Sequence, residues 1–185
     1  MSWQLDKAHS SINFSVRHMM ISTVRGRFEE FDGTFDLNET NPTQSKIEVV
    51  IQTASINTKE AQRDAHLKSP DFFDVEKYPV IMFKSKRIEQ LDKQHARLAG
   101  NLTIKGITKE VVLDVEYAGQ AKSPWGTINA GFTAQTKINR KDWDLTWNVA
   151  LETGGVLVSD EVTISIELEI IKQAEAAPEL EPVLA

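Results

Sequence analysis

The sequence predicts an all-β fold in which eight antiparallel strands close into a barrel, with one short helical insertion. Three observations lead to this fold class. Apolar and polar residues alternate with a period of two in eight segments, turn-forming residues separate the segments, and no regular alternation with long helices is present. A sheet of this size with one apolar face must stack as two sheets or close on itself, and closure removes exposed edges. We therefore expect a barrel, with a two-sheet sandwich as the alternative architecture.

The strands are predicted from the alternation itself. In the first segment, Ile12, Phe14 and Val16 share an apolar face opposite polar neighbours, and His18 continues that face. The predicted strands span residues 12–18, 31–37, 47–51, 81–85, 98–104, 111–117, 128–138 and 162–170. Turn signals are Asp32-Gly33, Lys105-Gly106, Ser123-Pro124 with Gly126, and Gly154-Gly155.

One segment departs from the strand pattern. Residues 57–69 are rich in helix-forming residues, and Asn57 with Glu60 three residues later resembles a capping box. Ser69-Pro70 is expected to start a further short turn that carries Phe72 and Phe73. We expect this insertion to cover one mouth of the barrel.

Length and composition favour one domain. The 185 residues are 41% hydrophobic, which is enough apolar surface for a core of their own. We assign residues 1–171 to the barrel domain and residues 172–185, which are acidic and contain proline, to a disordered tail. The net charge of -6 argues against nucleic acid or an anionic membrane surface as a partner.

Location is predicted from what the sequence lacks. The chain has no cysteine, no apolar leader after Met1 and no stretch long enough to span a bilayer. We therefore expect a cytoplasmic protein, or a periplasmic one if an upstream signal has been removed.

The sequence carries no recognisable catalytic or cofactor motif. It has no nucleophile elbow, phosphate-binding loop, dinucleotide fingerprint or EF-hand loop. No two of its four histidines have the local spacing of a helical zinc site, and a metal held by His18, His66 and Asp64 is the weaker interpretation of those residues. Acidic pairs such as Glu29 with Glu30 are typical of solvated strand faces. We expect no enzyme activity, no cofactor and no metal.

The sequence nevertheless resembles a known family. Ser55-Ile56-Asn57-Thr58, followed by Arg63-Asp64-Ala65-His66-Leu67-Lys68-Ser69-Pro70-Asp71-Phe72-Phe73-Asp74, is similar to the signature of the YceI-like polyisoprenoid-binding family. Further matching pieces include His9-Ser10, Gly100-Asn101-Leu102-Thr103 and Ile138-Asn139-Arg140-Lys141-Asp142. The resemblance implies a lipocalin-like eight-stranded barrel that holds an isoprenoid or fatty chain, often as a homodimer and without assigned catalysis. Two departures are the missing export signal and Asp142-Trp143-Asp144, where the family usually has Asp-Phe-Gly.

The candidate site combines an apolar interior with a few polar groups. An eight-stranded barrel is either filled by side chains or holds one small ligand, so the inner faces decide between these states. We expect the tail of the ligand to contact Phe14, Phe35, Phe83 and Phe132, and its headgroup to contact His18, Asp64, His66 and Arg140. For Arg140, a structural ion pair with Asp142 or a neighbour is the alternative role.

Three functions follow from these expectations. The first is binding, carriage or sequestration of a long-chain amphiphilic lipid such as a polyisoprenoid, a quinone precursor or a fatty acid. The second is an enzyme that acts on an isoprenoid lipid, and the third is an interaction protein with a filled barrel. We favour the first, because the inner faces are apolar and catalytic motifs are missing.

Overall fold

The computed structural model describes residues 3–173, and structural statements concern these residues. The strands are β1 (Gln4–Leu5), β2 (Ser11–His18), β3 (Ser22–Phe28), β4 (Phe31–Asp36), β5 (Lys46–Gln52), β6 (Ile56–Asn57), β7 (Val80–Gln90), β8 (His95–Ile104), β9 (Ile107–Lys122), β10 (Thr127–Asn139) and β11 (Glu161–Gln173). The helices are α1 (Ala61–Lys68) and the short 3-10 segments η1 (Lys7–His9), η2 (Pro42–Gln44), η3 (Thr53–Ser55) and η4 (Arg140–Trp143).

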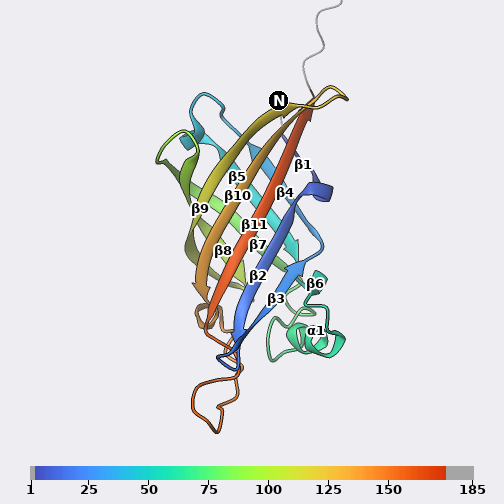
Figure 1. Ribbon diagram of the computed structural model, residues 1–185, viewed down its shortest axis with the longest axis vertical. Helices are drawn as coiled ribbons and strands as arrows, with labels where there is room; N and C mark the ends of the chain where they lie inside the picture. Colours follow the sequence, from blue (N-terminus) through green and yellow to red (C-terminus); the bar gives the residue numbers. More distant parts are fainter. Residues whose placement is uncertain (1–2, 174–185) are drawn as a thin grey trace, which may run out of the picture.

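The strands form one antiparallel sheet that curls around a central space (Figure 1). Its order is β4-β5-β7-β8-β9-β10-β11-β2-β3-β6, and β1 also pairs with β11. Most neighbours in the sheet are neighbours in the chain, as in a meander. Trp3 forms an isolated bridge with Phe35 of β4, so β1 links that edge of the sheet back to β11. The predicted antiparallel all-β fold is thus confirmed, and the two-sheet sandwich is not what forms. The predicted closure into a barrel is not confirmed, because the sheet is a curled half-barrel whose path of paired strands ends at β4 and β6.

The predicted number of strands was too low, because the sheet contains eleven. All eight predicted segments lie on strands, but β3 was missed together with the two-residue strands β1 and β6. In β3, Val24 and Phe28 face the interior, and Gly26 stands between them at the position where a third apolar side chain would complete the alternation. A glycine at an inward position hides the period-two signal.

The predicted turns were correct in part. Lys105 and Gly106 join β8 to β9 with φ angles of 51° and 73°, a two-residue hairpin turn between the paired Ile104 and Ile107. Asp32-Gly33, in contrast, lies inside β4, where these residues pair with Val50 and Val49. The glycine in that strand serves close packing and not chain reversal.

The helical insertion is confirmed, but its predicted cap is wrong. Helix α1 begins after Glu60, whose carboxylate accepts hydrogen bonds from the backbone N–H groups of Gln62 (3.1 Å) and Arg63 (2.6 Å). Asn57 belongs to β6, and its side chain accepts from the backbone N–H of Lys59 (2.8 Å). Lys59 has a positive φ of 62°, which separates the strand from the helix and moves the helix start past Asn57. Figure 1 shows α1 at one end of the curled sheet.

The buried core is divided between two clusters. One lies around Phe28, Phe72 and Trp143, and the other comprises Trp3, Phe35, Ala130 and Ile170. Along β10 and β11, many inward side chains are only half-buried, because the space that they face is not filled. β11 continues to Gln173, two residues past the predicted domain boundary, and the rest of the predicted tail lies outside the described residues.

Candidate functional site

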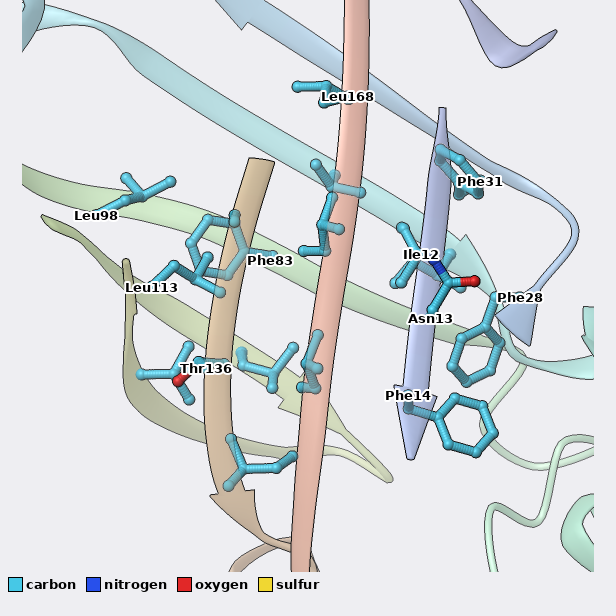
Figure 2. A pocket seen from close by; sticks show the side chains of 18 of the residues that line it. Ile12, Asn13, Phe14, Phe28, Phe31, Phe83, Leu98, Leu113, Thr136 and Leu168 are labelled. Carbon is cyan, nitrogen blue, oxygen red and sulfur yellow. The ribbon is translucent and has the colours of Figure 1, made fainter. Parts of the chain in front are cut away.

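A cavity of about 800 Å³ occupies the inside of the curled sheet. Its wall is built mainly from inward-facing apolar side chains of β2, β7, β8, β9, β10 and β11 (Figure 2). The volume is within the range of ligand pockets, roughly 300–1,000 Å³. The number of strands does not by itself make a barrel hollow, because side chains can fill the interior. A cavity therefore requires that the side chains of the wall leave the centre free.

Three phenylalanine rings pack closely against glycines in the wall. Phe14 of β2 stands directly opposite Gly26 of β3, and a Cβ at Gly26 would lie 2.3 Å from the ring. Phe83 of β7 covers Gly100 of β8, where a Cβ would lie 2.4 Å from the ring. Real Cβ atoms do not approach this closely, so glycine alone lets each ring sink into the wall.

Phe35 covers Gly33 on its own strand in the same way, because a Cβ at Gly33 would lie 2.8 Å from the ring. Phe35 is fully buried, whereas Phe14, Phe83 and Phe132 are half-buried because they face the cavity. Phe132 of β10 packs beside Tyr117 of β9, with the ring centroids 5.2 Å apart. All four predicted tail contacts line the cavity, and the glycines beneath three of them keep the centre open.

The two ends of the cavity differ in chemistry. At the end covered by α1, the lining includes His18, Arg63, His66 and Trp147. At the other end it includes Asn38 and Glu39 after β4, and residues 92–95 between β7 and β8. The apolar middle is therefore bounded by polar groups at both ends, which suits a molecule with a long apolar body and a polar end.

Two predicted headgroup residues, His18 and His66, lie at the α1 end. His18 is the last residue of β2, and its backbone forms an isolated bridge with Val158. The Nε2 atom of His66 lies 2.9 Å from the Asp71 carboxylate. The His66 ring stands edge-on to Trp147, with centroids 4.6 Å apart, so its orientation is fixed from two sides.

Asp64 does not line the cavity, unlike its two predicted companions. One of its carboxylate oxygens accepts hydrogen bonds from the Thr58 backbone N–H (2.8 Å) and hydroxyl (2.6 Å). Arg63 completes this unit by donating to the Thr58 hydroxyl and carbonyl oxygens, both at 2.8 Å. Asp64 thus holds α1 against the preceding turn. Arg63, and not Asp64, lines the cavity wall.

Arg140 has a structural role in the loop after β10. It is 3% exposed, and its guanidinium donates to the backbone carbonyls of Ser159 (2.9 Å), Trp147 (3.0 Å), Val158 (3.3 Å) and Leu145. Its ion-pair partner is Asp160 at 3.8 Å, and not the predicted Asp142. Burial lowers the pKa of Arg140, and Asp160 opposes this shift. The side chain touches the cavity, but its donors hold residues 145–160 in place.

The departure at Asp142-Trp143-Asp144 has a local explanation. Trp143 is buried and donates its indole N–H to the Leu102 carbonyl oxygen (3.0 Å), so the larger ring gains a partner in the core. Asp144 has a φ of 59°, in the left-handed region that glycine adopts at lowest cost. Neither side chain lines the cavity.

Several lining residues were missed from the sequence. Trp147 and Leu157 lie in the loop between η4 and β11, where no periodic pattern marks an inward direction. Arg63 belongs to the family signature but was not assigned to the wall. The signal for it was its position three residues before His66, because residues three apart share a helix face.

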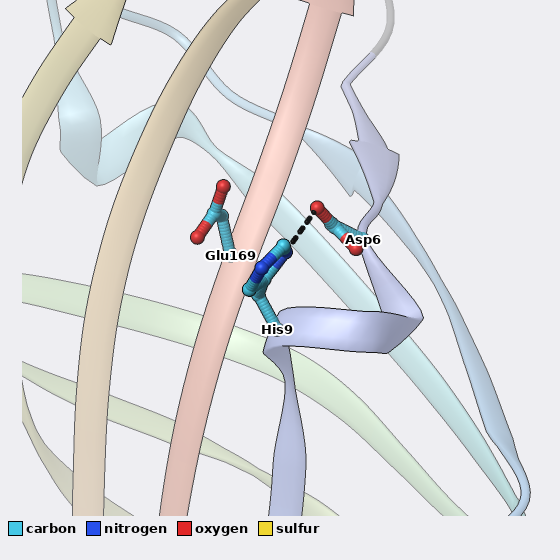
Figure 3. Close-up of side chains that lie close together, drawn as sticks. All are labelled: Asp6, His9 and Glu169. Carbon is cyan, nitrogen blue, oxygen red and sulfur yellow. Dashed lines mark hydrogen bonds and ion pairs between the residues drawn. The ribbon is translucent and has the colours of Figure 1, made fainter. Parts of the chain in front are cut away.

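A separate polar cluster lies on the outside of the sheet, where Asp6, His9 and Glu169 place their ligand-type atoms within 4.8 Å of one another (Figure 3). The Asp6 carboxylate contacts His9 Nδ1 at 2.8 Å and caps η1 by accepting from the Ala8 N–H. The bond to His9 lowers the pKa of Asp6, and the same bond raises the pKa of His9. Glu169 accepts from Asn129 Nδ2. These bonds account for the cluster as a capped turn held against β11.

The comparisons with known proteins agree with this architecture. Residues 3–170 match the sequence model of the YceI-like domain family. The chain is 37% identical over 173 residues to Protein YceI of Salmonella newport (strain SL254), covering 92% of this chain and 87% of that protein. It is 39% identical over 159 residues to the UPF0312 protein plu2095 of Photorhabdus laumondii, covering 86% of this chain and 80% of the relative.

Solved structures share the fold. The YCEI protein of Campylobacter jejuni is 35% identical, with a TM-score of 0.73 over 91% of this chain and 96% of that one. A polyisoprenoid binding domain from Saccharophagus degradans has a TM-score of 0.65 at 16% identity, covering 93% of this chain and 98% of that domain. At that identity the likeness concerns the fold alone. Within residues 3–173, no helix has the length and apolar character needed to cross a membrane.

Proposed function

Because the chain belongs to the YceI-like domain family, we propose that it binds the apolar tail of a long-chain amphiphilic lipid inside its curled sheet. The observation that carries this proposal is the apolar cavity of about 800 Å³, which runs between two polar ends. The curled wall would then act as a lipocalin-like barrel. A filled-barrel interaction protein is the weaker alternative, since a filled barrel leaves no such space.

Apolar burial supplies enough free energy for binding. Each methylene-sized group that leaves water contributes about 0.8 kcal/mol, so ten such groups contribute roughly 8 kcal/mol before the entropic cost of association. The cavity wall offers few polar groups in its middle, so affinity would grow with tail length and not with specific hydrogen bonds. Isoprenoid, quinone-like and fatty tails all satisfy this chemistry, and the binding domain of Saccharophagus degradans is described as a polyisoprenoid binder.

We assign the headgroup to the α1 end of the cavity. His18, Arg63 and His66 lie there, and they offer one cationic and two titratable groups to a polar or anionic headgroup. Asp64 is left out of this site because Thr58 uses its carboxylate, and Arg140 because carbonyl oxygens use its donors. Carriage or sequestration without catalysis, in the cytoplasm and as a homodimer, completes the proposal.

The first test is chemical identification of the cargo. The protein is purified under mild conditions and extracted with organic solvent, and the extract and the intact complex are both measured by mass spectrometry. A near-stoichiometric isoprenoid or fatty species supports the proposal and reports the oligomeric state. Protein that is empty and also refuses added lipid contradicts it.

A matched pair of variants tests whether the lipid binds inside the sheet. Ala134 and Gln135 are neighbours on β10, and only Ala134 faces the cavity. Ala134→Trp is expected to lower the affinity for a fluorescent fatty probe by about tenfold or more, because the indole takes up space that the tail needs. Gln135→Trp adds the same ring to the exposed face and should leave the affinity unchanged. Equal affinities in the two variants would place the probe elsewhere.

A further inference from the structure

The turn between β2 and β3 exposes three consecutive apolar side chains. Met19, Met20 and Ile21 are 42%, 55% and 77% exposed. The turn is closed by a hydrogen bond from the Ile21 N–H to the His18 carbonyl oxygen (3.1 Å). None of the three side chains belongs to the buried core clusters of the described residues.

The backbone of this turn is also unusual for its residues. Met19 and Met20 have φ angles of 51° and 63°, a left-handed pair that hairpin turns normally fill with asparagine and glycine. Backbone strain and exposed apolar side chains therefore occur together in this turn. Such combinations point to a function for the side chains, because they stabilise neither the turn nor the core.

The turn adjoins the α1 end of the cavity. His18, directly before it, lines the cavity, as do Leu157 and Val158. The Met19 N–H donates to the Leu157 carbonyl oxygen (2.8 Å), and Met20 lies against Gly155. The same loop carries Val149, which is 46% exposed. Exposed apolar side chains thus continue from the cavity mouth onto the outer surface.

The charges on this hairpin are positive. From Ser11 to Phe28 the chain contains Arg17, Arg25 and Arg27 and no acidic residue. Arg27 pairs with Glu29 (2.9 Å). Arg17 and Arg25 form no ion pair with any described residue, and the Arg17 guanidinium donates to the Thr23 hydroxyl and to the Met20 carbonyl oxygen. The neighbouring loop adds Glu152 and, beside Lys141, Asp160. The hairpin itself is therefore cationic, beside an acidic loop and on a protein whose net charge is -6.

We propose that the β2–β3 turn, residues 19–21, inserts into the surface of an anionic lipid bilayer and so turns the cavity mouth toward the membrane. The apolar side chains would enter the headgroup layer, while Arg17 and Arg25 contact lipid phosphates. The overall negative charge opposes adsorption in other orientations, so it selects this end. A protein partner fits less well, because three side chains at a turn are far from the roughly 800 Å² that each partner of a stable complex buries.

This proposal rests on the proposed function, because it names the source from which the lipid enters the cavity. It is tested by sedimentation of the full chain with vesicles of phosphatidylcholine, with and without phosphatidylglycerol. The test variant combines Met19→Asn, Met20→Gly and Ile21→Ser, which removes the apolar groups and supplies the residues that the turn prefers. The fold should therefore be retained, and circular dichroism checks it.

The control is Trp125→Ser. Trp125 is 87% exposed in the turn between β9 and β10, which lies at the opposite end of the sheet from α1 (Figure 1). The unmodified protein and Trp125→Ser are expected to bind the anionic vesicles, and the triple variant is expected to bind about tenfold more weakly or not at all. Transfer of a fluorescent lipid between vesicles should slow in the triple variant alone.

The two proposals fail in different ways. Docking is overturned if the unmodified protein does not sediment with anionic vesicles, if the triple variant sediments equally well, or if Trp125→Ser is the variant that fails. None of these outcomes bears on ligand binding in the cavity, because that binding is measured separately with a monomeric probe in solution. Loss of probe binding in every form of the protein would instead overturn the proposed function.

Discussion

The contact between Phe14 and Gly26 allows the hollow interior to be tested with a single methyl group. A Cβ at Gly26 would have three ring atoms of Phe14 as its nearest neighbours, at 2.3, 2.9 and 2.9 Å. Ordinary contact begins at 3.4 Å, so in Gly26→Ala the ring must move toward the lumen by about 1 Å. Gly26 is in the middle of β3 and has no positive φ, so alanine fits its backbone.

Two effects of different size follow. Overpacking typically costs about 1–3 kcal/mol of stability. The displaced ring also takes space from the ligand, and if it excludes two methylene-sized groups, the loss is about 1.6 kcal/mol of binding free energy, or roughly 15-fold in affinity. The binding effect should grow with tail length up to the point where the tail reaches this ring, and then remain constant.

The assay is titration with fluorescent fatty probes, beside urea unfolding of the same preparations. Gly131→Ala is the control, because its Cβ would meet only Ala118 at 3.5 Å, an ordinary contact. Adding Phe14→Leu to Gly26→Ala should restore both affinity and stability, since the smaller side chain leaves room for the new methyl group. Unchanged affinity in a folded Gly26→Ala protein would refute the argument that this ring borders the ligand.

Three further predictions concern stability and its dependence on pH. Arg140→Met should destabilise the protein by about 3 kcal/mol, because it leaves buried carbonyl oxygens without donors; an unchanged urea midpoint would contradict this. The ion pairs with Arg87 and Lys86 lower the pKa of Glu110 from 4.5 to about 2, so the folded state binds fewer protons than the unfolded state between these values. This contribution is present above about pH 4.5 and lost as the pH falls toward 2, so the stability difference from Glu110→Gln should shrink between about pH 6 and about pH 3. Asp144→Gly should stabilise the protein by up to about 1 kcal/mol, since glycine removes the strain of a φ of 59°, and a lower midpoint would show that the side chain matters more than the backbone.

The strands were predictable wherever apolar side chains occupy every second position. Residues 128–138 and 162–170 show this best, because every second residue there faces the cavity or the core and most of the residues between them are polar. β3 was not predictable in this way, since Gly26 has no side chain to count. The helix was predicted from its composition, but its first residue depends on the left-handed Lys59, which no capping pattern in the sequence indicates.

The apolar contacts predicted for the candidate site all line the cavity. Of the four predicted polar residues, His18 and His66 line it as expected, whereas Asp64 and Arg140 serve other contacts. Phe14, Phe35, Phe83 and Phe132 lie on strands whose direction the alternation determines, so their inward position follows. The positions of the polar side chains depend on tertiary contacts that the period-two pattern of the sequence does not indicate. Asp64 is used by Thr58, and Arg140 is used by carbonyl oxygens of residues 145–159, which come from turns and a loop.

Whether such a sheet is packed or hollow is decided by the residues beneath its aromatic rings. A phenylalanine that faces an alanine or valine on the next strand must project into the centre, whereas one that faces glycine can place its ring where the missing Cβ would be. Phe14 over Gly26 and Phe83 over Gly100 are of the second kind, and each pair joins neighbouring strands. The pairing becomes visible only when the register is known, because the two residues of a pair are far apart in the sequence. The register of the sheet, more than its apolar composition, is therefore what makes this interior available to a ligand.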